Sequence, residues 1–129
     1  MSGRFHHLDI YVADLAQAVE FWGPFLEQLG FRKAVDRPTA KSWSGAGAEL
    51  FFVQAEPEFV THGYHRKRIG LNHLAFAVGS RDELGTVLEW VRARGQRLLY
   101  AGVIEETATQ HRFFFEDPER IKVEVLAER

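Results

Sequence analysis

The sequence contains no cysteine, and this absence excludes several classes of protein at once. None of its 129 residues is cysteine, so disulfide bonds, thiolate metal sites and a cysteine nucleophile are ruled out. Basic residues are not in excess either: 16 Lys and Arg stand against 18 Asp and Glu, for a formal net charge of −2. We therefore expect neither nucleic acid nor an anionic membrane surface as a partner.

Long apolar runs are also missing. No segment approaches the roughly 20 apolar residues that a membrane-spanning helix needs, and the first residues, MSGRFHHLDI, do not have the pattern of a signal peptide. We therefore expect a cytoplasmic protein with no membrane partner. The chain does contain 46% hydrophobic residues and 26% charged residues, which is an ordinary composition for a globular domain with a core.

The first predicted strand lies in FHHLDIYVADL, residues Phe5 to Leu15. Side chains along a strand alternate between its two faces, and here an apolar set alternates with a polar one. The apolar face holds Leu8, Ile10 and Val12, and the other face holds His7, Asp9 and Tyr11. Asp14 has the character of a helix N-cap, because Gln17 follows at capping-box spacing and an amphipathic pattern continues beyond it.

The same pattern returns in GLNHLAFAVGSRDEL, which begins at Gly70. His73 follows His7 by 66 residues, and a second predicted N-cap, Ser80, follows Asp14 by 66 residues as well. We interpret this as an internal repeat, each half running strand, helix and three strands. The predicted parts of the single domain, 1–129, are a module at 1–58, a connector at 59–69 and a module at 70–129.

Two histidines at equivalent places in a repeat suggest a shared site. If a pseudo-twofold axis relates the halves, His7 and His73 point toward one cavity. In the last predicted strand Glu124 lies between Val123 and Val125, so it faces away from the apolar side and needs a partner if it is buried. Two imidazoles and a carboxylate suit a divalent first-row metal such as Fe, Mn, Ni or Zn. The alternatives are hydrogen-bonded histidines at strand starts and a salt bridge from the glutamate.

Four motifs give the chain a resemblance to a known family: HHLDIYVADL, GPFLEQLGF, LNHLAFAV and FFFEDPERIKVEV. They resemble the vicinal oxygen chelate superfamily, which includes glyoxalase I, fosfomycin and bleomycin resistance proteins and extradiol dioxygenases. The resemblance covers essentially the whole chain. It implies an α+β fold of two βαβββ modules, whose strands form a cupped mixed sheet around one site.

The resemblance also implies a set of site residues. His7, His73 and Glu124 match the family's metal ligands. Glyoxalase I-like members carry a second glutamate on the last strand of the first module, where Glu49 could serve as a fourth ligand, although the best placement puts Phe51 at that position. The expected substrate pocket is lined by Asp9, Tyr11, Phe51 and His111, with plain strand residues at the cavity wall as the alternative for Asp9 and Tyr11.

The function implied is that of a metal-dependent lyase, isomerase, dioxygenase or transferase. Its small-molecule substrate chelates the metal through adjacent oxygens, and the metal acts as a Lewis acid. The alternative is a binding protein, similar to the bleomycin resistance proteins, that sequesters an aromatic drug or metabolite without catalysis. Exposed sheet edges predict a homodimer, so the site lies within one chain or is shared across the dimer. The substrate, the metal and the catalytic residue stay open.

Overall fold

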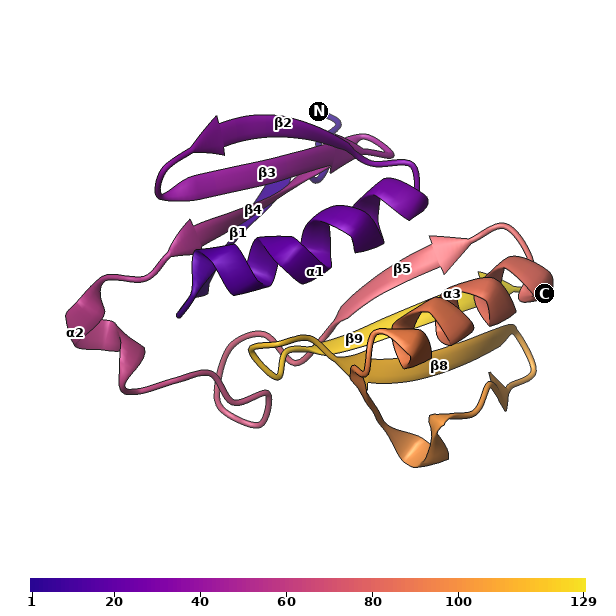
Figure 1. Cartoon of the computed structure of the whole chain (residues 1–129). Helices are drawn as coiled ribbons and strands as arrows, with labels where there is room; N and C mark the ends of the chain where they lie inside the picture. Colours follow the sequence, from indigo (N-terminus) through magenta and orange to yellow (C-terminus); the bar gives the residue numbers. More distant parts are fainter. The chain divides into compact units, whose positions relative to one another are not determined.

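A computed structural model describes all 129 residues of the chain. They form two compact units, Met1–Gly63 and Tyr64–Arg129 (Figure 1). The boundary between the units lies between Gly63 and Tyr64. The division into modules at 1–58 and 70–129 with a connector at 59–69 stays a prediction. No helix is long and apolar enough to cross a bilayer.

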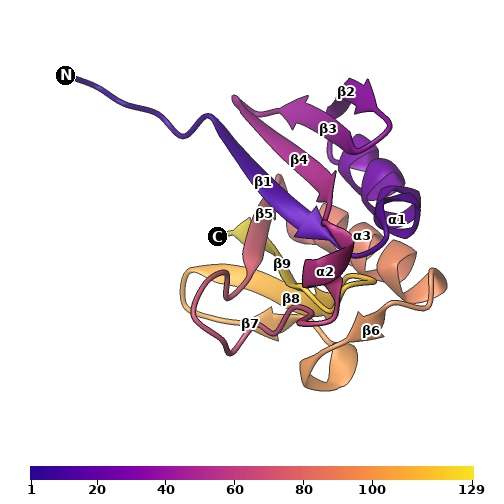
Figure 2. The same cartoon turned by 90° about the vertical axis from the view of Figure 1, so that its left-hand side faces the viewer.

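The first unit contains a four-stranded mixed sheet with one long helix on it. Its elements are β1 (His7–Val12), α1 (Leu15–Gln28), β2 (Arg32–Arg37), β3 (Ala40–Gly45), β4 (Ala48–Gln54) and the short α2 (Pro57–Val60). The strand order is β1-β4-β3-β2, with β1 parallel to β4 and the other pairs antiparallel. Figure 2 shows α1 along one face of this sheet, and the residues before β1 extending away from it.

Local signals in the sequence explain where α1 begins and which side it buries. The Asp14 side chain accepts a hydrogen bond from the Gln17 backbone N–H at 3.1 Å, which caps the helix. The buried side of the helix packs on the sheet, where the rings of Trp22 and Phe52 lie 5.1 Å apart and neither side chain is exposed. This contact forms the centre of an aromatic core, because Phe25 and Trp43 are buried beside it.

The second unit repeats this arrangement with an additional short strand. Its elements are β5 (Leu74–Val78), α3 (Arg81–Ala93), β6 (Arg97–Leu98), the 3-10 turn η1 (Tyr100–Gly102), β7 (Glu105–Glu106), β8 (Gln110–Glu116) and β9 (Lys122–Glu128). The strand order is β5-β9-β8-β6, with β7 paired to β8. The Ser80 side chain caps α3 by accepting from the Glu83 N–H at 3.1 Å. The predicted α+β class and its two βαβββ modules are confirmed.

The strand registers show which residues of the two units are equivalent. In each unit the first strand runs parallel to the last one, and Leu8 pairs with Leu50 as Leu74 pairs with Val123. One residue further along β4 and β9, Phe51 therefore has the place in the first sheet that Glu124 has in the second. The repeat is preserved in backbone pairing, while the side chains at this position differ in chemistry.

Candidate functional site

His73 and Glu124, both predicted as metal ligands, meet in the second unit. His73 lies immediately before β5, and Glu124 lies in β9, between Val123 and Val125, whose side chains point into the core. The Nε2 atom of His73 is 3.1 Å from Oε2 of Glu124, although 51 residues separate them in the chain. Glu124 is only 6% exposed. Two predicted ligands are therefore in direct contact on the sheet face opposite α3.

Two amide side chains hold this pair in place. Gln110 Nε2 donates to the second carboxylate oxygen, Oε1 of Glu124, at 3.3 Å. On the other side of the imidazole, Nδ1 of His73 is 2.7 Å from Oδ1 of Asn72. An amide oxygen is an acceptor, so in this arrangement Nδ1 carries the hydrogen. With Nδ1 beside Asn72, Nε2 is the ring nitrogen that meets the Glu124 carboxylate.

This donor set fits a divalent metal. An imidazole nitrogen and a carboxylate oxygen are ligands for Fe, Mn, Ni and Zn. In protein metal sites the second nitrogen of a ligating histidine usually donates to a neighbouring oxygen, as His73 does to Asn72. No group of three or more His, Asp or Glu side chains is assembled in either unit, so a complete site needs ligands from beyond this pair.

His7, the third predicted ligand, begins β1 in the first unit. Its side chain is half exposed. Its Nδ1 atom is 2.9 Å from Nδ1 of His6, its Nε2 atom is 3.6 Å from Oδ1 of Asp9, and its ring is 5.6 Å from that of Phe51. Asp9 is thus the carboxylate nearest the imidazole along β1. That His7 joins His73 and Glu124 on one ion stays a prediction.

Glu49, the predicted fourth ligand, already has a partner within its own unit. Its Oε1 atom accepts a hydrogen bond from Ser42 Oγ at 2.6 Å, and the same Oγ accepts from the Val35 N–H at 2.9 Å. Phe51, not Glu49, has the place equivalent to Glu124. The role of Glu49 as a ligand stays a prediction that these contacts do not favour.

The four predicted pocket residues are distributed over different faces of the sheets. Asp9, Tyr11 and Phe51 lie on the face of the first sheet opposite α1, and Tyr11 is 71% exposed there. Phe114 is the cross-strand neighbour of Glu124 and faces away from α3. His111 lies three residues before Phe114 in β8, so its side chain is on the opposite face, which α3 covers. Its imidazole therefore points away from the face that carries Glu124.

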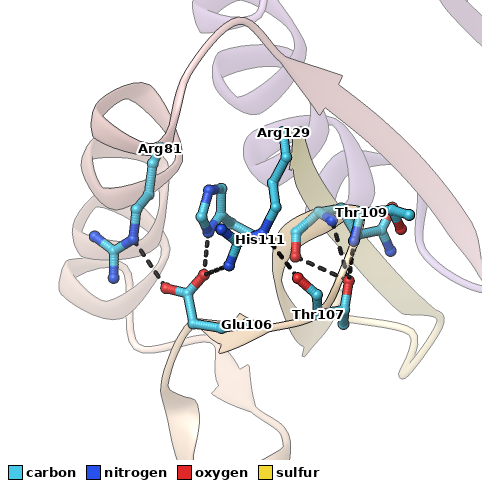
Figure 3. Close-up of polar contacts among 7 residues, drawn as sticks. Arg81, Glu106, Thr107, Thr109, His111 and Arg129 are labelled. Carbon is cyan, nitrogen blue, oxygen red and sulfur yellow. Dashed lines mark hydrogen bonds and ion pairs between the residues drawn. The ribbon is translucent and has the colours of Figure 1, made fainter.

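His111 belongs to a polar network on the outer edge of the second unit (Figure 3). Its Nδ1 atom contacts the carboxylate of Glu106, which also receives hydrogen bonds from Arg81 at 2.9 Å and from Arg129 at 3.2 Å. The hydrogen bond from His111, and next that from Arg81, hold the pKa of the Glu106 carboxyl below its ordinary value. The network ties β7 to the start of α3 and to the C-terminal residue.

Two residues beside the histidine–glutamate pair were not singled out from the sequence. Asn72 directly precedes His73. Gln110 lies four residues before Phe114 in β8 and so shares its face. The period of two in that strand would have located Gln110, but nothing in the sequence distinguishes Asn72 from an ordinary loop residue.

Comparison with known proteins places this chain in a family. The model of the Glyoxalase/Bleomycin resistance protein/Dioxygenase superfamily matches residues 4–125. The chain belongs to this superfamily. The uncharacterized protein YqjT of Bacillus subtilis (strain 168) is 39% identical over 124 residues, which is 95% of this chain and 97% of YqjT.

Solved structures of the superfamily share the fold. A Bacillus halodurans protein described as a candidate glyoxalase is 37% identical, with a TM-score of 0.89 over 97% of this chain and 96% of that one. The fosfomycin resistance protein FosX of Listeria monocytogenes is similar with a TM-score of 0.73 and 17% identity, over 98% of this chain and 94% of FosX. At that identity the likeness to FosX concerns the fold alone.

Proposed function

We propose that this protein is a metal-dependent enzyme whose small-molecule substrate chelates a divalent ion through adjacent oxygen atoms. The observation that carries the proposal is the contact between His73 and Glu124, in which Nε2 of the imidazole lies 3.1 Å from an oxygen of a buried carboxylate. Membership of the superfamily supports it. Lyase, isomerase, dioxygenase and transferase reactions are all compatible with this donor set.

Three protein ligands are proposed for the ion: His73 and Glu124 from the second unit and His7 from the first. When bound, an Fe, Mn, Ni or Zn ion would supply Lewis acidity to the oxygen atoms of a substrate. The chain's own groups prepare the ligands, because Asn72 holds the tautomer of His73 and Gln110 holds one oxygen of Glu124. These contacts leave Nε2 of His73 and Oε2 of Glu124 as the atoms that would hold an ion.

The test is the metal content and metal affinity of protein purified without chelators. We expect close to one ion per chain, and at least about 100-fold weaker affinity after Glu124→Ala or His73→Ala, because a direct ligand contributes more than the 10- to 100-fold typical of its supporting groups. His7→Ala should weaken binding to a similar degree. Glu128→Ala removes an exposed carboxylate from the same strand and is the matched control.

Glu49→Ala separates a three-ligand site from a four-ligand site. We expect less than about a twofold change in metal affinity, since the Glu49 carboxylate is engaged by Ser42. A loss comparable with that of Glu124→Ala would show that Glu49 is a ligand. Native protein that retains no ion in chelator-free buffer, and binds none on titration, would end the proposal.

A second candidate function is sequestration of an aromatic drug or metabolite without catalysis. The exposed ring of Tyr11 and the partly exposed ring of Phe51, both opposite α1, favour it. Chelator-treated protein that binds an aromatic ligand as tightly as the metal-loaded protein does would support sequestration. A ligand that binds only in the presence of the ion would support the enzyme.

We further propose that the protein acts as a homodimer in the cytoplasm. Strands β1 and β2 end the first sheet on either side, and unpaired strand edges favour association. Sedimentation velocity on the wild-type chain checks the oligomeric state, and a monomer at micromolar concentration would contradict it.

A further inference from the structure

The loop after β6 holds two consecutive residues in an unfavourable backbone conformation. Tyr100 has a φ of 52° and Ala101 a φ of 66°, in the left-handed region that residues other than glycine rarely adopt. Such conformations persist where surrounding contacts enforce them, and they concentrate at functional sites. Here Arg92 donates to the Gly102 carbonyl at 3.0 Å, and the Leu99 N–H donates to the Phe114 carbonyl at 3.0 Å. The backbone is therefore fixed on both sides of Tyr100.

The Tyr100 side chain on this loop contacts Lys122. The Lys122 ammonium donates to the Tyr100 hydroxyl at 2.7 Å. It lies 4.9 Å from the centre of the Tyr100 ring and 4.7 Å from that of Phe114. No carboxylate pairs with this ammonium. An ammonium has three hydrogens to donate, and the hydroxyl takes one of them.

The lysine lies beside the proposed metal ligands. Lys122 and Glu124 are two residues apart in β9, so their side chains emerge on the same face of the sheet. Phe114 pairs across the strands with Glu124, and its ring is 6.2 Å from that of His73. The Phe114 ring thus has the His73 imidazole, the Lys122 ammonium and the Tyr100 ring as neighbours. All five residues belong to the second unit.

We propose that Lys122, Tyr100 and Phe114 form a binding subsite for an oxyanion, a carboxylate or phosphate group carried by the substrate. The subsite deepens the proposed function, since the same molecule would chelate the ion with its other end. An ammonium placed against two aromatic rings is partly withdrawn from water, which strengthens a charge-assisted hydrogen bond to an anion. Tyr100 is a positioning residue, because its hydroxyl accepts a hydrogen bond from the ammonium and so orients it. The Tyr100 ring is half exposed.

Anion binding to the full-length chain, freed of metal with a chelator, tests the subsite. Benzoate and inorganic phosphate are the two probes, and benzyl alcohol is the uncharged control for benzoate. We expect one or both anions to shift the amide signals of Tyr100, Phe114 and Lys122 in two-dimensional NMR spectra, while benzyl alcohol leaves them in place. A response to benzoate alone indicates a carboxylate substrate, and a response to phosphate alone indicates a phosphorylated one.

Substitutions then assign the effect to the lysine. Lys122→Met keeps the aliphatic stem and removes the charge, and we expect about tenfold weaker anion binding, the size of one charge-assisted hydrogen bond. Tyr100→Phe keeps the ring, and we expect about threefold weaker binding with a displaced Lys122 side-chain signal. Lys67→Met removes an exposed lysine from the loop before β5 and should leave the anion affinity unchanged.

Two results would overturn the subsite: no anion-dependent shift at these residues, or equal anion affinity in wild type and Lys122→Met. Because binding is measured on metal-free protein, its outcome is independent of the metal titration. Loss of the anion effect with intact metal binding refutes the subsite alone. Absence of metal binding with an intact anion effect refutes the proposed enzyme alone.

Discussion

The two units of this protein share one topology but differ at the residues that face away from their helices. In the first unit Phe51 has the position that Glu124 has in the second. Each lies beside a histidine at the start of the first strand: the His7 ring is 5.6 Å from Phe51, and His73 Nε2 is 3.1 Å from Glu124. The repeated backbone places the pairs alike, and the side chain alone decides whether the histidine meets a ring or a carboxylate.

Two residues before Phe51 and Glu124, the equivalent side chains of the two units carry opposite charges. Glu49 in β4 is equivalent to Lys122 in β9, and Ser42 in β3 is equivalent to Phe114 in β8. In the first unit the carboxylate accepts a hydrogen bond from the serine. In the second unit the ammonium lies over the phenylalanine ring. Equivalent positions of the two sheets therefore hold a carboxylate–hydroxyl hydrogen bond in the first unit and an ammonium–ring contact in the second.

The largest expected difference between the units concerns their cores. Phe52 and Val125 are equivalent, fully buried residues, but Phe52 packs between Trp22 and Trp43. Phe52→Ala should lower the free energy of unfolding by about 3–5 kcal/mol, because it removes a large side chain and leaves a cavity. Val125→Ala should cost about 2 kcal/mol. Urea unfolding of both variants measures the difference, and equal losses would show that the aromatic core has no special weight.

A second prediction concerns a buried carboxylate that the first unit lacks. Glu116, at the end of β8, is 2% exposed, whereas its equivalent Ser44 is exposed. Burial raises the pKa of the Glu116 carboxyl, but hydrogen bonds from Arg120 and Arg66 outweigh this and leave the pKa below its ordinary value of 4.5. Glu116→Gln should lower the free energy of unfolding by about 2 kcal/mol at pH 7.

The stabilisation by Glu116 should be lost in acid. A carboxyl whose pKa is lower in the folded state contributes stability that is present above the unfolded-state value of 4.5 and is lost as the pH falls through the folded value. The stability of wild type should therefore approach that of Glu116→Gln as the pH falls below 4.5 and through the folded value. Ser44→Ala is the control, and a gap between wild type and Glu116→Gln that does not narrow in acid would contradict the account.

The smallest effect is expected from making the first unit resemble the second. Phe51→Glu places a carboxylate beside His7, and we expect about tenfold tighter Ni(II) binding, measured by calorimetry. Val53→Glu adds the same charge two residues further along the same face and should not change the affinity. Equal effects of the two substitutions would mean that surface charge, not position, controls metal binding.

Local features of the fold were predictable because they depend on residues close together in the chain. The N-caps at Asp14 and Ser80 are three residues from the N–H groups that they accept from. Alternation along β1 and β9 placed the polar side of each strand, so the outward position of Glu124 followed from its two valine neighbours. The 66-residue repeat of His7 at His73 likewise needed no coordinates.

Only the tertiary structure decided how distant segments pair. A shift of one residue in register turns every side chain of a strand to the other face, and the sequence does not encode that register locally. The pairing of β1 with β4 and of β5 with β9 makes Phe51 the counterpart of Glu124 in the sheets, the position that the resemblance to the family also gave it. The same pairing brought His73 to Glu124 across 51 residues. The contact between Lys122 and Tyr100 depends on the left-handed backbone of the loop that carries Tyr100. No local pattern predicts this backbone, because hydrogen bonds from Arg92 and to β8 enforce it.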